Sequence, residues 1–155
     1  IKELSNLVIC RTFSKVYGLA GLRIGYAISN RENIRALRER HLGWGMATSM
    51  ASVVGAKAAL SDSEFISKCV GKNEEGRQIL YKAFDKWNVK YSHSATNFVY
   101  TTSLNRFQKD FISKLRAEKI QISQWGFMNY EYARISISTP EDMREFVGRA
   151  EKYLV

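Results

Sequence analysis

The stretch RTFSKVYGLAGLRIGY, residues 11–26, decides which fold the sequence predicts. It begins at the end of LVICR, a short β-rich run at residues 7–11, and it overlaps a second such run, LRIGYAI, at residues 22–28. Apolar runs of this length with glycines between them are typical of strands in a buried sheet. We therefore expect two buried strands joined by a glycine-rich loop that carries Lys15.

The loop contains side chains that are suited to binding a phosphate group. Thr12 and Ser14 supply hydroxyls, and Arg23 supplies a guanidinium that can pair with two oxygens at once. The glycines let the backbone approach a ligand closely, and Lys15 adds an amine that can act as a Schiff-base nucleophile. Each of these residues alone is more often an ordinary loop residue, so the hypothesis depends on their combination.

Two other interpretations of the same segment, a nucleotide-binding loop and a Ser-Lys hydrolase, are disfavoured. GLAGLRIG lacks the G-x-G-x-x-G pattern of a dinucleotide site and the G-K-[ST] ending of a P-loop. A Ser-Lys hydrolase is disfavoured because Ser14 and Lys15 are adjacent, and adjacent side chains of an extended segment point to opposite faces.

The segment as a whole resembles the cofactor-lysine signature of fold-type I aminotransferases, which use pyridoxal 5'-phosphate (PLP). In the histidinol-phosphate aminotransferase-like group this signature is T-x-S-K-x-x-G-L-A-G-L-R-x-G-Y, and every fixed position is matched from Thr12 to Tyr26. The resemblance implies that Lys15 holds the cofactor covalently and moves the substrate proton, and that Thr12, Ser14 and Arg23 bind the cofactor phosphate.

The resemblance also implies an α/β fold, of which the chain would be the C-terminal part. We expect a remnant of the PLP-binding large domain at residues 1–60, a connecting helix at 61–88 and a small C-terminal α/β domain at 89–155. Family members place the groups that hold the pyridine ring before the lysine, including an Asp, but the fourteen residues before Lys15 contain none. We therefore expect an incomplete fragment of an enzyme.

The helices of the first half follow from capping residues and periodicity. Residues 31–40 predict a helix capped by Asn30, and the small side chains of residues 47–60 predict a helix packed closely in an interior. A long helix capped by Asp62 or Ser63 then connects two regions of the structure.

The second half predicts a small α/β layer. Residues 98–101, 120–122 and 133–137 read as strands, and residues 106–119 read as an amphipathic helix. Thr139, followed by proline and acids, predicts the start of the last helix.

Two downstream segments resemble the substrate-binding parts of the same family. ARISISTPED resembles the segment whose arginine binds the substrate α-carboxylate, which implies this role for Arg134. SATNF resembles the family's S-x-A-N-F, which implies that Asn97 orients the carboxylate, although an Asn before a strand is also an ordinary turn residue.

The substrate side chain is the point at which the sequence departs from histidinol-phosphate aminotransferases. Those proteins carry G-I-x-V-R before the last strand, with an arginine suited to the substrate phosphate, whereas this chain has Ser123 at that position. We therefore expect a different substrate. Trp44, Trp125 and Phe127 are candidates for an apolar or aromatic pocket, and core packing explains each of them equally well.

Composition excludes several other classes of protein. The net charge of +9 comes from scattered residues, so we expect no nucleic acid as a partner, and the absence of an apolar run of about 18 residues predicts no membrane span. Cys10 and Cys69 lie far apart, and His41 and His93 are isolated. These features predict a reduced, cytoplasmic protein without a metal site.

The sequence as a whole predicts an enzyme that uses PLP to transfer an amino group between an amino acid and a 2-oxo acid. The family implies a homodimer for the full-length protein. Two alternatives stay open at this point: a PLP-dependent decarboxylase or lyase of the same fold, and a non-catalytic fragment.

Overall fold

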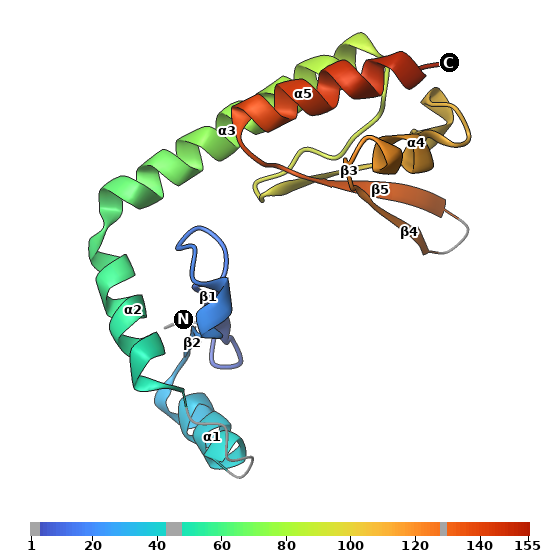
Figure 1. The fold of residues 1–155 in the computed structure, drawn as a ribbon. Helices are drawn as coiled ribbons and strands as arrows, with labels where there is room; N and C mark the ends of the chain where they lie inside the picture. The colour runs from blue at the N-terminus through green and yellow to red at the C-terminus, as the bar shows by residue number, and fades with distance from the viewer. Residues whose placement is uncertain (1–3, 43–47, 128–129) are drawn as a thin grey trace. The chain divides into compact units, whose positions relative to one another are not determined.

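The computed structural model describes residues 4–42, 48–127 and 130–155. These fall into two compact units, Ile1–Lys68 and Cys69–Val155, which we call the first and the second unit and describe separately (Figure 1). In chain order the elements, with 3₁₀ helices labelled η, are β1 (Ile9–Thr12), η1 (Ala20–Leu22), β2 (Gly25–Ile28), α1 (Arg31–Leu42), α2 (Met50–Ser61), α3 (Ser63–Lys86), β3 (Phe98–Thr101), η2 (Leu104–Arg106), α4 (Phe111–Ala117), β4 (Ser123–Phe127), β5 (Tyr130–Ser136), α5 (Pro140–Ala150) and η3 (Glu151–Tyr153).

The first unit contains the two strands expected from the sequence, and they form an antiparallel pair. The register runs from Ile9 opposite Ile28 to Thr12 opposite Gly25. The expectation of buried strands was wrong for the described chain, because every residue of β2 and all but Ile9 of β1 are exposed. Apolar composition predicts a strand, but burial depends on which segment packs against it, and a two-stranded ribbon has two faces to cover.

The first helix, α1, begins where its predicted capping residue places it, whereas α2 begins at Met50, after the cap Ser49, rather than at the predicted residue 47. The main-chain N–H of Asn33 donates to Asn30 Oδ1 at 2.9 Å at the start of α1, which confirms the cap. The expected interior packing of α2 was wrong: only Ser52 and Ala56 are buried in it, and Met50 is 73% exposed. Small residues instead allow one close contact, because a Cβ on Gly55 would lie 2.9 Å from Leu22 Cδ1.

The long connecting helix of the sequence prediction is α3, which spans 24 residues. It begins after Asp62, whose Oδ1 accepts a hydrogen bond from the Phe65 N–H at 2.9 Å. The boundary between the two units falls within this helix, after Lys68. In the described part of the chain no helix, α3 included, is both long and apolar enough to cross a membrane.

The second unit is built on a three-stranded antiparallel sheet in the order β3-β5-β4. One face of the sheet, with Val99, Ala133 and Ile135, is buried in a continuous apolar core that includes side chains of α3, α4 and α5. The helices α3 and α5 lie against one another, because Arg144 pairs with Glu75 at 2.6 Å (Figure 1).

In the second unit, the boundaries predicted for β3 and the predicted start of α5 are confirmed. At the start of α5, the Thr139 hydroxyl accepts a hydrogen bond from the Asp142 N–H at 3.2 Å. The strand expected at 120–122 was wrong, and the predicted helix at 106–119 shortens to α4. The physical reason lies at Lys119, whose φ of 64° ends the helix in a turn. Residues 120–122 leave that turn, and pairing with β5 begins only at Ser123.

Candidate active site

Phe13 anchors the segment of residues 12–24, from the last residue of β1 to the start of β2. This segment, which we call the Lys15 loop, carries four of the predicted site residues. Its side chain is only 3% exposed, and its ring packs against Tyr17 and Tyr26 at centroid distances of 4.8 and 5.7 Å. Its neighbours Thr12 and Ser14 are exposed and half-buried. The alternation of side chains along an extended segment therefore turns both hydroxyls away from the buried ring.

Short-range hydrogen bonds fix the first part of this loop. The Ser14 N–H donates to Thr12 Oγ1 at 3.0 Å, and the Gly18 N–H donates to the Lys15 carbonyl at 2.8 Å. Gly18 has a φ of 68°, a conformation that glycine adopts without steric cost. Lys15 is exposed, and its amine has no hydrogen-bond or ion-pair partner among the described residues.

The second part of the loop places Arg23. This residue ends η1 in the left-handed region, with a φ of 48°, and its Nη1 donates to the Ala20 carbonyl at 3.0 Å. The buried hydroxyl of Ser52 holds the preceding turn by donating to the Leu22 carbonyl at 2.7 Å. The bond from Arg23 to the Ala20 carbonyl occupies one of the five N–H groups of the guanidinium, which leaves the exposed Arg23 side chain able to bind an anion.

The strand register brings both parts of the loop together. Thr12 lies opposite Gly25, and the Phe13 N–H donates to the Ile24 carbonyl at 3.1 Å. A Cβ at Gly25 would lie 2.6 Å from the Arg11 carbonyl oxygen, so only glycine permits this approach. Two hydroxyls, one amine and one guanidinium therefore belong to a single short loop, a donor set that matches a phosphate with an adjacent carbonyl.

Arg134 lies on β5 in the second unit, on the face opposite the core. Its neighbours Ala133 and Ile135 are buried, whereas Arg134 itself is half-buried. The guanidinium carbon lies 5.3 Å from the centroid of the Phe98 ring, a cation–π arrangement. Its Nε is buried and has no hydrogen-bond partner among the described residues, and buried donors without partners are rare in folded proteins.

Asn97 comes directly before β3, next to Phe98. Its carbonyl accepts a hydrogen bond from the Ile137 N–H at 2.8 Å, which fixes its backbone to the end of β5. The Asn97 side chain is exposed. Asn97 and Arg134 are both in the second unit, and Thr12, Ser14, Lys15 and Arg23 are all in the first.

Sequence reasoning missed three residues that shape these groups: Phe13, Ser52 and Phe98. The polar–apolar–polar order of residues 12–14 could have identified Phe13 as an anchor. Nothing in the sequence distinguishes Ser52 from other small residues of α2. Of the predicted pocket aromatics, Trp44 lies outside the described residues, as do the side chains of Trp125 and Phe127.

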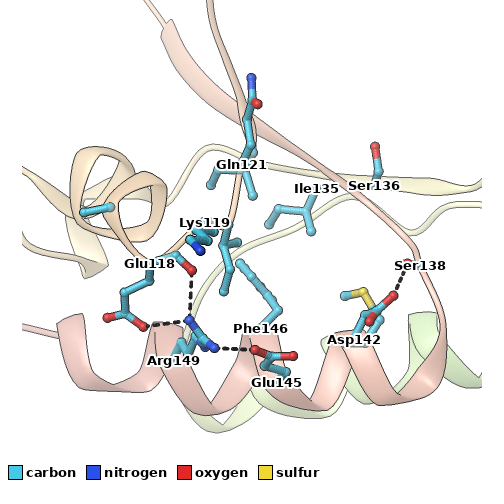
Figure 2. A pocket seen from close by; sticks show the side chains of 14 residues that line it. Glu118, Lys119, Gln121, Ile135, Ser136, Ser138, Asp142, Glu145, Phe146 and Arg149 are labelled. Atoms are coloured by element: carbon cyan, nitrogen blue, oxygen red, sulfur yellow. Dashed lines mark hydrogen bonds and ion pairs between the residues drawn. The ribbon is translucent and has the colours of Figure 1, made fainter.

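The second unit also contains a pocket of about 730 Å³ between α5, the end of α4 and β5, and none of the six predicted site residues lines it. Figure 2 shows Arg149 between Glu118 and Glu145, with Ile135 and Phe146 nearby. Arg149 Nη1 donates to the Glu118 carbonyl at 2.9 Å and lies 3.4 Å from its carboxylate. These contacts tie α5 to the end of α4, so the charged rim has a structural role.

Comparison with known proteins gives one family. The sequence model described as Aminotransferase class I and II matches residues 1–149. A histidinol-phosphate aminotransferase of Brevibacillus brevis is 37% identical over 142 residues, which cover 91% of this chain and 38% of that protein. One from Bacillus cereus is 36% identical, with 95% of this chain and 39% of that protein covered. The chain thus spans about two fifths of the length of these relatives.

A solved structure agrees with the sequence comparison. The histidinol-phosphate aminotransferase of Sinorhizobium meliloti, determined in complex with pyridoxal 5'-phosphate, superposes with a TM-score of 0.78 at 29% identity. The alignment covers 96% of this chain and 41% of the other. The α/β fold expected from the sequence, as part of a PLP-dependent transferase, is therefore confirmed.

Proposed function

The chain belongs to the class I and II aminotransferases, and from this premise we propose that the whole protein transfers an amino group from an amino acid to a 2-oxo acid with PLP as cofactor. When bound, PLP supplies an electrophilic carbonyl and an electron sink for this reaction. The observation that carries the proposal is the Lys15 loop: an exposed amine without a partner among the described residues, beside two hydroxyls and an arginine.

The residues of this loop divide the work of holding the cofactor. The hydroxyls of Thr12 and Ser14 donate to phosphate oxygens, and the Arg23 guanidinium adds a charged pair. The Lys15 amine would hold the cofactor by condensing with its carbonyl, with loss of water. Once the substrate amine has displaced it, the free Lys15 amine would take the proton from the substrate α-carbon and return it two atoms away, across the nitrogen. The Phe13 anchor and the Ser52 bond to Leu22 keep these groups in place.

Arg134 binds the substrate α-carboxylate, and Asn97 orients it. The buried Nε of Arg134 is a donor that lacks a partner among the described residues, and a carboxylate can satisfy it together with a terminal N–H. Phe98 supports this by stacking below the guanidinium. An arginine that is held on a rigid strand loses little entropy when the substrate binds.

The substrate in this proposal is an amino acid without a phosphate group. Ser123 lies directly across from Arg134 in the β4–β5 register, where its neutral hydroxyl supplies no positive charge to balance a phosphate dianion. Turnover of histidinol phosphate should therefore be slower than that of an apolar or aromatic amino acid at equal concentration. A clear preference for histidinol phosphate would refute this part of the proposal.

The proposal also includes a homodimer and a cytoplasmic location. The homodimer follows from the family resemblance, and the cytoplasmic location follows from Cys10 and Cys69, which form no disulfide. Size-exclusion chromatography with light scattering on the whole protein tests the first point, and a mass of one chain would contradict it.

The activity is tested with the purified whole protein, an amino-acid donor and a 2-oxo-acid acceptor. We expect the acceptor to appear as a new amino acid, and borohydride reduction of the PLP-loaded protein to mark the peptide that contains Lys15. Release of carbon dioxide without a new amino acid would favour a decarboxylase. A labelled peptide elsewhere in the protein would refute the assignment of Lys15.

A further inference from the structure

We propose that Arg77, on α3, is a positioning residue that holds the segment before β3 so that Asn97 can orient the substrate carboxylate. This inference rests on the proposed function and adds a residue that neither the sequence motifs nor the site itself includes. Arg77 does not contact the reacting atoms in this proposal, and it acts through Thr96 and Asn97.

The contact that carries the proposal is a side-chain to main-chain hydrogen bond across nineteen positions of the chain. Arg77 Nη1 donates to the Thr96 carbonyl at 2.7 Å. The Arg77 side chain is only 12% exposed, so a largely buried guanidinium reaches the exposed Thr96. Thr96 directly precedes Asn97, and the bond therefore fixes the peptide plane that leads into the carboxylate-orienting residue.

The guanidinium is itself held by side chains of the preceding turn of α3. Arg77 Nη1 also approaches Asn73 Oδ1 at 3.3 Å, and Nη2 pairs with Glu74. Hydrogen bonds from the Gln78 amide and from Arg77 lower the pKa of the Glu74 carboxyl, which keeps it ionised as a partner. Only a planar group with several fixed donors can serve Thr96 and these two acceptors together.

Asn97 is thus fixed from both sides. Toward the N-terminus, the Ser94 N–H donates to the hydroxyl of the buried Tyr81 at 2.7 Å, and the Ser94 and Thr96 hydroxyls lie 2.9 Å apart. Toward the C-terminus, the Asn97 carbonyl accepts from the Ile137 N–H at 2.8 Å. Within the described residues, Arg77 is the charged side chain that joins α3 to this segment.

The same segment continues into the support of Arg134. Phe98 follows Asn97 and lies under the Arg134 guanidinium at 5.3 Å. A shift of Thr96 would therefore move the groups that meet the carboxylate, while the core around Leu80 would keep its packing. The loss of Arg77 should therefore weaken substrate binding without disturbing the core, and the KM for the amino acid measures this effect.

The experiment compares Arg77→Ala, Arg77→Lys and Arg144→Ala in the whole PLP-loaded protein. Arg144 is the matched control, because it also joins α3 to another element of the second unit, by its ion pair with Glu75, but does not contact the segment before β3. We expect Arg77→Ala to raise the KM for the amino acid about tenfold with kcat changed less than about twofold, since a misplaced orienting group weakens binding. Arg77→Lys should recover part of the loss, and Arg144→Ala should leave KM unchanged.

A double-mutant cycle with Asn97→Ala separates positioning from general destabilisation. If Arg77 acts through Asn97, Arg77→Ala should raise the KM by a much smaller factor in the Asn97→Ala background than in the unmodified protein. Additive effects, an unchanged KM in Arg77→Ala, or an equal rise in Arg144→Ala would each overturn the proposal. Tyr81→Phe, which keeps the ring and removes the acceptor for Ser94, provides a second variant if Arg77→Ala does not fold, and it should raise KM by a smaller factor.

The failure of this inference is distinguishable from a failure of the proposed function. If the unmodified protein transfers no amino group, the proposed function is wrong. If the unmodified protein is active and the Arg77→Ala variant has the same KM as the unmodified protein, only the role of Arg77 is wrong.

Discussion

The two units of the chain hold their functional groups by different means. In the first unit, the Lys15 loop is fixed mainly by hydrogen bonds between residues close in sequence, such as Ser14 to Thr12 and Gly18 to Lys15, on a ribbon of exposed strands. In the second unit, Arg134 depends on the strand register and on a buried core drawn from the whole unit. A contiguous motif can therefore specify the first group, whereas the second requires the tertiary fold.

The largest expected effect tests the first half of this comparison. Lys15→Ala should lower the rate of amino transfer in the whole protein by at least about a thousandfold, because it removes the covalent attachment and the proton carrier together. Without PLP, the free energy of unfolding should change by less than about 0.5 kcal/mol, since Lys15 is exposed and its amine has no partner among the described residues. Steady-state kinetics and denaturant unfolding measure the two quantities, and substantial residual transfer would contradict the role of Lys15.

The contrast between the units also explains how much the sequence could predict. The six proposed site residues were named from local patterns, and the caps Asn30, Asp62 and Thr139 were located because capping is decided within one turn. Burial was the quantity most often wrong, for β1, β2 and α2, because hydrophobicity does not reveal what lies against a segment.

Arg77 shows a second limit of the sequence. Its partner Thr96 is separated from it by the end of α3 and a loop, and an arginine on a helix among charged residues reads as a solvated surface. The start of β4 is a similar case. Lys119, with its positive φ, ends the turn after α4, and pairing with β5 then begins at Ser123, opposite Arg134. Both features are tertiary, and no pattern along the sequence contains them.

The next largest effect compares one apolar residue from each unit. Leu80→Ala, at a fully buried position of the second unit, should cost about 3 kcal/mol of unfolding free energy through lost contacts and a cavity. Val54→Ala, at a position of α2 that is 62% exposed, should change it by less than about 0.5 kcal/mol. Denaturant unfolding of the same chain measures both. Equal losses would mean that the first unit buries Val54 in solution and that the contrast in packing is wrong.

Gly25, in β2 next to the Lys15 loop, and Gly71, in α3, compare a crowded glycine with an uncrowded one. Gly25→Ala should destabilise the protein by about 1–3 kcal/mol, because its Cβ would lie 2.6 Å from the Arg11 carbonyl oxygen and the strands would have to separate. Gly71→Ala, in α3 with nothing within 4 Å of the new Cβ, should stabilise it by about 0.5–1 kcal/mol through helix propensity. The same unfolding measurement applies, and a neutral Gly25→Ala would show that the β1–β2 approach is not tight.

The smallest expected effect is a pH dependence that belongs to the second unit. The hydrogen bond from the Tyr153 hydroxyl, followed by the charges of Lys152 and Arg149, lowers the pKa of the Glu118 carboxyl below its ordinary value of 4.5. The unfolded chain therefore binds this proton more readily than the folded chain does. The stabilisation is complete above about pH 4.5 and is lost as the pH falls through the lower folded value.

Two variants should reduce this loss of stability with acid. Glu118→Gln removes the titrating group, and Tyr153→Phe removes the largest cause of its lowered pKa, so both should show a shallower fall in unfolding free energy below pH 4.5 than the unmodified chain. Tyr153→Phe should keep the part of the acid dependence that comes from the 3.4 Å ion pair between Arg149 and Glu118. An acid dependence identical in all three proteins would place the stabilising carboxylates elsewhere in the second unit, where Glu74, Asp142 and Glu151 also have a lowered pKa through hydrogen bonds.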